Sequence, residues 1–338
     1  AFTWGLMALR PEFQTRSVID VLNVLALGSV PILLLSLLLY KFAELAIYDR
    51  PKHPVPHLLG MMWDVLGNPA RLAAGLPMVI AVFLFMYDFA VVKANISTFQ
   101  PFAWDQTLDR WDAALHFGFR PWELLQPLVG YPAVTFLLNL NYNAWFLTMN
   151  LFMVYYAFLA APGQRRTRFF LAFMFIWIIG GGLLATMFSS GGPCFFGAGR
   201  LGLSPDPYAA LMAYLRHANE LVPIWSVSTQ DMLWSLRDEQ SALGGVSAMP
   251  SMHNATALLF ILASASFPLW VRLGVIAHGV LVFIGSVHLG WHYAVDAYLA
   301  WGVTLLVWWG VTPVAKWWES TAFQRNFKAA LGLADGDA

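Results

Sequence analysis

Seven long apolar runs constrain the fold of this chain more than any other feature of its sequence. A helix needs about 20 apolar residues to cross the hydrocarbon core of a bilayer. The runs that qualify lie at about 18–40, 74–92, 132–160, 167–188, 252–269, 272–290 and 292–313. Charged residues make up only 11% of the chain, whereas a soluble domain carries roughly 25%. We therefore expect an all-α fold, a polytopic membrane helical bundle of about six or seven transmembrane helices.

Charge and cysteine content exclude several classes of protein. The 19 basic and 19 acidic residues give a formal net charge of zero, which argues against a nucleic-acid binder. Cys194 is the single cysteine, so an internal disulfide and a multi-cysteine zinc or iron–sulfur site are excluded. The first residues lack a basic region followed by an apolar core, and we expect no signal peptide there.

The basic residues predict the orientation in the membrane. If all seven runs cross the membrane, three loops lie on the same side as the tail. These are the loops that follow the first, third and fifth runs. These segments hold most of the basic residues, including Arg165, Arg166 and Arg168. Basic loops face the cytoplasm. We therefore expect a multi-pass integral membrane protein whose remaining long segments face the periplasm or a lumen.

Two outer segments predict short helices that lie at the membrane surface. In "WDQTLDRWDAALHFG", Trp104, Leu108, Trp111 and Leu115 recur at helical spacing, which is typical of an interfacial helix. The insert at 189–247 holds two further short helices, near 206–220 and 229–242. Gly244-Gly245 is the C-cap signal that ends the second of these helices.

Three stretches on the outer side carry residues suited to chemistry. They are "SSGGPCFFGAGR" from Ser189, "MPSMH" from Met249 and "GSVHLGWHYAVDA" from Gly285. His292 and Asp296 are four residues apart, so on a helix the carboxylate can accept a hydrogen bond from the imidazole. That bond selects one tautomer and stabilises a developing imidazolium. A histidine held in this way can attack phosphorus or accept a proton.

The stretch "MPSMH" predicts a helix start with a histidine in its first turn. Pro250 or Ser251 suits the first helical position or the cap. His253 then lies where free backbone N–H groups and the helix dipole favour a phosphate.

Two other interpretations of the histidines stay open. His292 and Asp296 can form a purely structural bond. His288, His292 and Asp296 also recur every four residues, a spacing that suits a metal. Because the Pro-Ser-Met-His context at a helix start favours phosphate over metal, we predict a site with no metal and no cofactor.

The two histidine motifs resemble those of a known family. "PSMH", followed by "HYAVD" one hairpin later, is similar to the type 2 phosphatidic acid phosphatase superfamily. The chain also resembles the inositol phosphorylceramide synthase-like branch of this superfamily. The motifs that carry this resemblance are Pro-Ser-Met-His, "WHYAVD" and "GGPCFF". The resemblance covers about 75–313. It implies that His292 is a nucleophile forming phospho-histidine, that Asp296 orients it, that His253 protonates the leaving oxygen, and that Ser251 holds the phosphate.

The cations that usually hold the phosphate in this superfamily are missing. The phosphatases carry a Lys-x6-Arg-Pro motif that is absent here, and Ser286 stands where they have an arginine. Backbone N–H groups of the loop around Gly192 can supply donors, and Arg200 is our first choice of cation. Lys93, Arg237 and His288 are further candidates. The predicted phosphate-binding residues are thus Ser251, Arg200, Gly192, His288 and Ser286.

These observations predict a membrane enzyme with three segments. We expect an N-terminal transmembrane helix and linker at 1–73, a catalytic domain at 74–313 and a cytoplasmic tail at 314–338. The predicted reaction moves a phosphate-linked head group between lipids, with membrane phospholipids or lipid alcohols as substrates. One alternative is a lipid phosphate phosphatase, in which water is the acceptor. Another is a catalytically silent membrane subunit that binds lipid or a partner protein.

Overall fold

The structure, a computed structural model, describes residues 29–237 and 245–333. In these ranges the regular elements are helices, with no strand, which confirms the all-α prediction. Five helices are long and apolar enough to cross a membrane: Val30–Asp49, Pro69–Ala94, Gln164–Met187, Leu269–His288 and Ala294–Glu319. The protein is therefore a multi-pass membrane protein.

The predicted apolar runs correspond to helices with shifted ends. The run at 18–40 begins outside the described residues, and its helix continues to Asp49. The run at 132–160 forms α9 (Pro132–Val154) and a short π-helix, Tyr155–Leu159. The run at 252–269 forms α14 (Met252–Ala263) and a short 3-10 turn. These last two runs are helical, but neither belongs to the five candidate spans, since α14 is short and α9 contains several asparagines.

The chain divides into two compact units. Unit 1 contains Asp88–Trp145 and Phe175–Val307. The described part of unit 2 consists of 29–87, 146–174 and 308–333. These are units of packing, and the three segments expected from the sequence stay a prediction.

Unit 2 holds helices α3 (Val30–Glu44), α4 (Pro54–Leu66) and α17 (Ala322–Ala330). An arginine from the predicted cytoplasmic loop binds α16 (Ala294–Glu319) within this unit. The Arg168 guanidinium lies 3.7 Å from the centre of the Trp308 ring and donates to the Trp308 carbonyl at 3.1 Å. Cation–π stacking of this kind stabilises an arginine at a membrane boundary.

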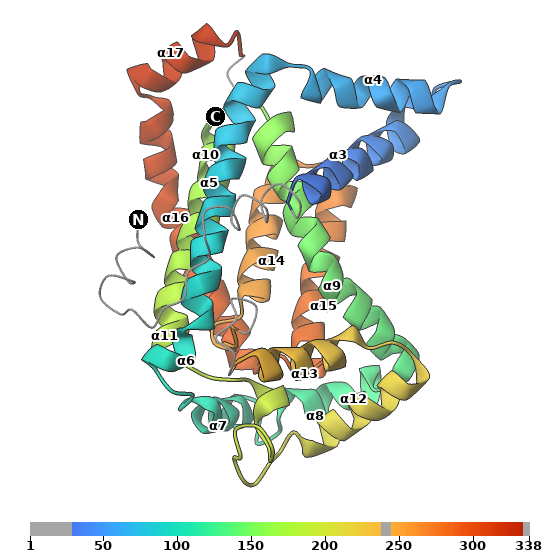
Figure 1. Cartoon of the computed structure of the whole chain (residues 1–338), viewed down its shortest axis with the longest axis vertical. Coiled ribbons are helices and arrows are strands. Elements are labelled where there is room, and N and C mark those ends of the chain that lie inside the picture. Colours follow the sequence, from blue (N-terminus) through green and yellow to red (C-terminus); the bar gives the residue numbers. More distant parts are fainter. Residues whose placement is uncertain (1–28, 238–244, 334–338) are drawn as a thin grey trace. The chain divides into compact units, whose positions relative to one another are not determined.

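In unit 1, α14 packs against α15 (Leu269–His288). Four short helices lie together across one end of this pair (Figure 1): α7 (Asp105–Leu115), α8 (Pro121–Val129), α12 (Ala209–Leu221) and α13 (Trp225–Arg237). Helices α7, α12 and α13 match the predicted outer helices. The predicted C-cap falls partly outside the described residues, because the structure does not describe Gly244.

Helix α13 contacts the chain that connects α15 to α16. The Gln230 side-chain amide donates to the Leu289 carbonyl at 2.8 Å. The Trp291 indole N–H donates to the Ser226 hydroxyl at 3.1 Å. Because His292 follows directly after Trp291, the outer insert fixes the segment that carries the predicted nucleophile.

Candidate active site

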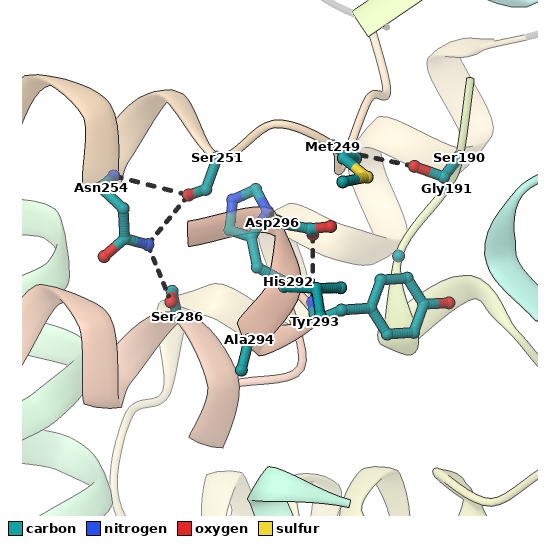
Figure 2. Close-up of polar contacts among 12 residues, drawn as sticks. Ser190, Gly191, Met249, Ser251, Asn254, Ser286, His292, Tyr293, Ala294 and Asp296 are labelled. Atoms are coloured by element: carbon teal, nitrogen blue, oxygen red, sulfur yellow. Dashed lines mark hydrogen bonds and ion pairs between the residues drawn. The ribbon is translucent and has the colours of Figure 1, made fainter. Parts of the chain in front are cut away.

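The three chemistry-bearing stretches meet within unit 1 and are joined by backbone hydrogen bonds. The Cys194 N–H donates to the Gly290 carbonyl at 2.8 Å, and the Ala248 N–H donates to the Ser190 carbonyl at 2.9 Å. The Ser251 N–H donates to the Asp296 carbonyl at 3.1 Å. Residues far apart in sequence therefore form one cluster (Figure 2).

His292 and Asp296 form the hydrogen bond that their spacing predicts. His292 Nδ1 lies 3.2 Å from Asp296 Oδ2. A carboxylate only accepts, so Nδ1 carries the proton and the neutral ring has its lone pair on Nε2. Burial lowers the pKa of His292, and the Ala248 backbone opposes this only in part. The neutral imidazole that nucleophilic attack requires is thus the favoured form.

Asp296 also begins the helix that carries it. It is the third residue of α16, and the Tyr293 N–H donates to the same Oδ2 at 3.1 Å. At this position, an acidic side chain can accept a hydrogen bond from the backbone N–H of the residue before the helix. That bond is one of the two in a capping box. One buried carboxylate oxygen therefore both orients the histidine and satisfies the helix start.

His253 lies between aromatic rings. Ser251 caps α14, with its hydroxyl accepting from the Asn254 N–H, so His253 falls in the first turn as predicted. Its ring stacks on Tyr142 at 4.4 Å between centroids and lies 4.1 Å from the Trp145 ring. Burial lowers the pKa of His253, so its neutral ring is the favoured form, and the electron-rich faces of the two aromatic rings stabilise the cation that forms when it gains a proton.

The rings of His253 and His292 are 6.4 Å apart, centroid to centroid. Both imidazoles are therefore close enough to act on one substrate group, one as nucleophile and one as acid or base.

An asparagine that we did not predict joins two of the predicted residues. Asn254 Nδ2 donates to the Ser251 hydroxyl at 3.0 Å and to the Ser286 hydroxyl at 3.1 Å. All three side chains are fully buried. Ser286 stands at the position where the resemblance implies an arginine, and its carbonyl accepts the His292 N–H at 3.0 Å. Ser286 thus lies in the cluster, where it supports the loop that carries His292.

The glycine-rich loop is bound to an aspartate of α7. The Gly191 and Gly192 N–H groups donate to the Asp105 carboxylate at 2.9 and 2.8 Å. The Tyr293 hydroxyl donates to the same carboxylate at 2.8 Å. Gly192 has φ 106°, and a Cβ there would lie 2.7 Å from the Trp291 carbonyl oxygen, so only glycine fits. The two N–H groups that we expected to hold phosphate are therefore already bonded.

A second aspartate of α7 caps the helix of Asp296. The Asp112 carboxylate accepts the N–H groups of Ala294 and Val295, the first residues of α16, each at 2.9 Å. Burial raises the pKa of Asp112 to about 7, and the two N–H donors oppose the rise.

The acidic residues of α7 thus face the protein, although the sequence indicated only a surface helix. Asp109 is also buried and accepts from Tyr208 and Arg120. The signal that could have predicted this was the spacing of the three aspartates, four and then three residues apart, on one helical face.

The structure does not place Arg200 or His288 in contact with the two histidines. Arg200 pairs with Asp231 and donates to the Cys194 carbonyl. His288 Nε2 lies 2.9 Å from the Thr135 hydroxyl. Their roles in phosphate binding stay predictions. Across residues 29–237 and 245–333, no group of three His, Cys, Asp or Glu side chains is arranged to hold a metal ion.

We expect Asp112→Asn to weaken both folding and catalysis. An amide cannot accept two N–H groups on two oxygens, and its own NH2 would face a backbone donor. Leaving such a buried donor unpaired costs about 1–3 kcal/mol. The melting temperature should fall, and kcat for a lipid phosphate should fall more than KM rises, because the start of α16 positions Asp296. Exposed Asp64 provides the control, since Asp64→Asn should change neither quantity. Wild-type melting and turnover in Asp112→Asn would contradict this role.

The comparison with known protein families gives one match. A family model of the PAP2 superfamily matches residues 106–310, which include His253, His292 and Asp296. No curated protein and no solved structure shows a significant match. The matched region covers more than half of the chain, and its histidines meet in one cluster in the structure. This membrane protein belongs to the PAP2 superfamily.

Proposed function

We propose that this protein transfers a phosphate-linked head group from one membrane lipid to the hydroxyl of another. Membership of the PAP2 superfamily supports, in general, an enzyme of phosphatase type that acts on lipid phosphates. The finer assignment is to the inositol phosphorylceramide synthase-like branch. The motifs of this chain that resemble that branch are Pro-Ser-Met-His, "WHYAVD" and "GGPCFF".

The reaction has two displacements at phosphorus. In the first, His292 Nε2 forms a bond to phosphorus while the bond from phosphorus to the leaving alcohol oxygen breaks, and His253 gives that oxygen a proton. In the second, the acceptor hydroxyl loses its proton to His253 and bonds to phosphorus as the phosphorus–nitrogen bond breaks. Asp296 stabilises the positive charge on His292 throughout. Ser251 holds the phosphate near the start of α14.

The arrangement of His292, Asp296 and His253 carries this proposal. The nucleophile is oriented by a fully buried carboxylate at 3.2 Å, and the second histidine lies 6.4 Å away, ring to ring. These are the parts that a phospho-histidine route needs. The chemistry assigned to them uses no metal.

The surroundings of the two histidines favour a lipid alcohol over water as the acceptor. His292 is 8% exposed, and Tyr142 and Trp145 cover the His253 ring. A site that excludes water protects a reactive intermediate from hydrolysis. The competing function, a phosphatase, requires water to reach phospho-His292.

The proposed transfer can be measured with purified protein in nanodiscs. The donor is a phospholipid labelled in its head group, and the assay contains EDTA and increasing amounts of a lipid alcohol. We expect labelled lipid product to increase while released water-soluble phosphate decreases, because the two acceptors compete for one intermediate. His292→Ala should abolish both products. Release of soluble phosphate alone, independent of the alcohol, would instead identify a phosphatase, and no turnover would favour a silent subunit.

We also propose that the site faces the periplasm or a lumen, because the order of the apolar runs in the sequence predicts that its loops and the basic loops fall on different sides. Cysteines at exposed Ser235 and Ser320 test this orientation. Native Cys194 is buried, and burial raises the pKa of its thiol, so it should react poorly. We expect a membrane-impermeant maleimide added outside intact cells to label Ser235→Cys only. Ser320→Cys should react after permeabilisation, and the reverse pattern would refute the proposed orientation.

A further inference from the structure

The proposed reaction needs a protonated His253 in its first step, when this histidine gives a proton to the leaving oxygen. Burial disfavours the charged ring, and so do the positive charges of His292 and Lys93. His292 lies just before α16, and Lys93 lies in the last turn of α5 (Pro69–Ala94). An interaction that opposes these three effects is therefore required for His253 to act as an acid.

Two aromatic side chains of α9 lie against the His253 ring. The Tyr142 ring is parallel to it within 13°, with 4.4 Å between centroids, and the Trp145 ring lies 4.1 Å away. The two residues are three positions apart and thus share one helical face. A cation within about 6 Å of an aromatic centroid is stabilised by the ring. Both rings are therefore close enough to stabilise a charged His253.

Trp145 is bonded to the same helix that carries His253. Its indole N–H donates to the Thr256 hydroxyl at 2.7 Å. The Thr256 hydroxyl in turn donates to the carbonyl of Met252, the first residue of α14, at 2.7 Å. The position of Trp145 relative to His253 is thus set by directed hydrogen bonds in addition to packing.

Tyr142 also stacks with the residue that precedes His292. Its ring is parallel to the Trp291 ring within 9°, with 6.4 Å between centroids. The Trp291 indole N–H is bonded to Ser226 of α13, so this ring is fixed as well. One buried phenol ring therefore relates the position of His253 to the loop that carries His292.

We propose that Tyr142 is a positioning residue that fixes the His253 ring relative to His292. Together with Trp145, it stabilises the imidazolium that His253 forms during proton transfer. The proposal deepens the proposed function and rests on it. None of the three chemistry-bearing stretches includes a residue of α9. A structural explanation exists, in which the two rings only fill space beside α14. It predicts that an apolar replacement slows the reaction equally at every pH.

The test measures the first displacement as a function of pH. Full-length protein in nanodiscs is mixed in excess with a phospholipid labelled in its leaving alcohol, and release of that alcohol is followed in a single turnover. Release reports the first step whichever acceptor follows. The rate should fall at high pH as His253 loses its proton, with a midpoint at the pKa of His253 in the complex.

We expect Tyr142→Leu to move this midpoint to lower pH by about one unit. Loss of the aromatic face destabilises the imidazolium, so the pKa of His253 falls and less of the acid is protonated at a given pH. Above the midpoint, release should therefore be about tenfold slower. His292, Asp296 and Lys93 are unchanged in this variant, so their effects on His253 cancel in the comparison.

Three further variants make the result specific. Tyr142→Phe keeps the ring face and should keep the wild-type midpoint and rate. Tyr142→Met is a second apolar variant if Tyr142→Leu folds poorly, and the melting temperature of each variant shows whether it is folded. Phe146→Leu removes an aromatic ring of the same helix that is 56% exposed, and it should behave like wild type.

Several outcomes would overturn the proposal. One is a wild-type midpoint in both Tyr142→Leu and Tyr142→Met, and another is a shifted midpoint in Phe146→Leu. Slow release by Tyr142→Phe would assign the effect to the phenol hydroxyl instead. No release by the wild type would overturn both this proposal and the proposed function. If the midpoint shifts as expected but the head group passes only to water, transfer between lipids fails and the positioning role stands.

Discussion

The buried carboxylate of Asp296 is the group on which the candidate site depends. Its Oδ2 accepts from both His292 Nδ1 and the Tyr293 N–H, so one atom orients the His292 ring and starts α16. A buried charge needs several donors to be tolerated. Moving the start of α16 by one residue would separate the two bonds, and the His292 ring would lose its orientation.

Helix α7 supports this arrangement from the end of unit 1 where the short helices lie (Figure 1). Asp112 binds the first N–H groups of α16, and Asp105 binds the glycine loop together with Tyr293. The two carboxylates thus connect the first and third chemistry-bearing stretches, while the Ser251 N–H joins the second stretch to Asp296. A helix that also carries exposed Trp111 and Leu115 therefore holds the site together.

Local features of the fold and site could be predicted from sequence, and long-range pairings could not. The spacing of His292 and Asp296 and the cap at Ser251 depend on neighbouring residues, and both are found as expected. The binding of Asp105 to Gly191, by contrast, joins residues 86 apart, and no periodic pattern encodes such a pair. Asn254 was missed for a related reason, because its amide has meaning only once Ser286 is beside it. The apolar runs predicted helices well. Hydropathy alone, however, predicted a membrane span where α14 lies, and α14 is too short to be one of the five candidate spans.

The central claim is that phosphorus passes through a covalent bond to His292. The most direct measurement is to react purified protein briefly with a phospholipid labelled on phosphorus, quench in alkali and locate the label by peptide mass spectrometry. Alkali preserves a phosphorus–nitrogen bond that acid would cleave. We expect label on the peptide containing His292, and no labelled peptide from His292→Ala. Turnover without a labelled peptide, or label on a different residue, would contradict it.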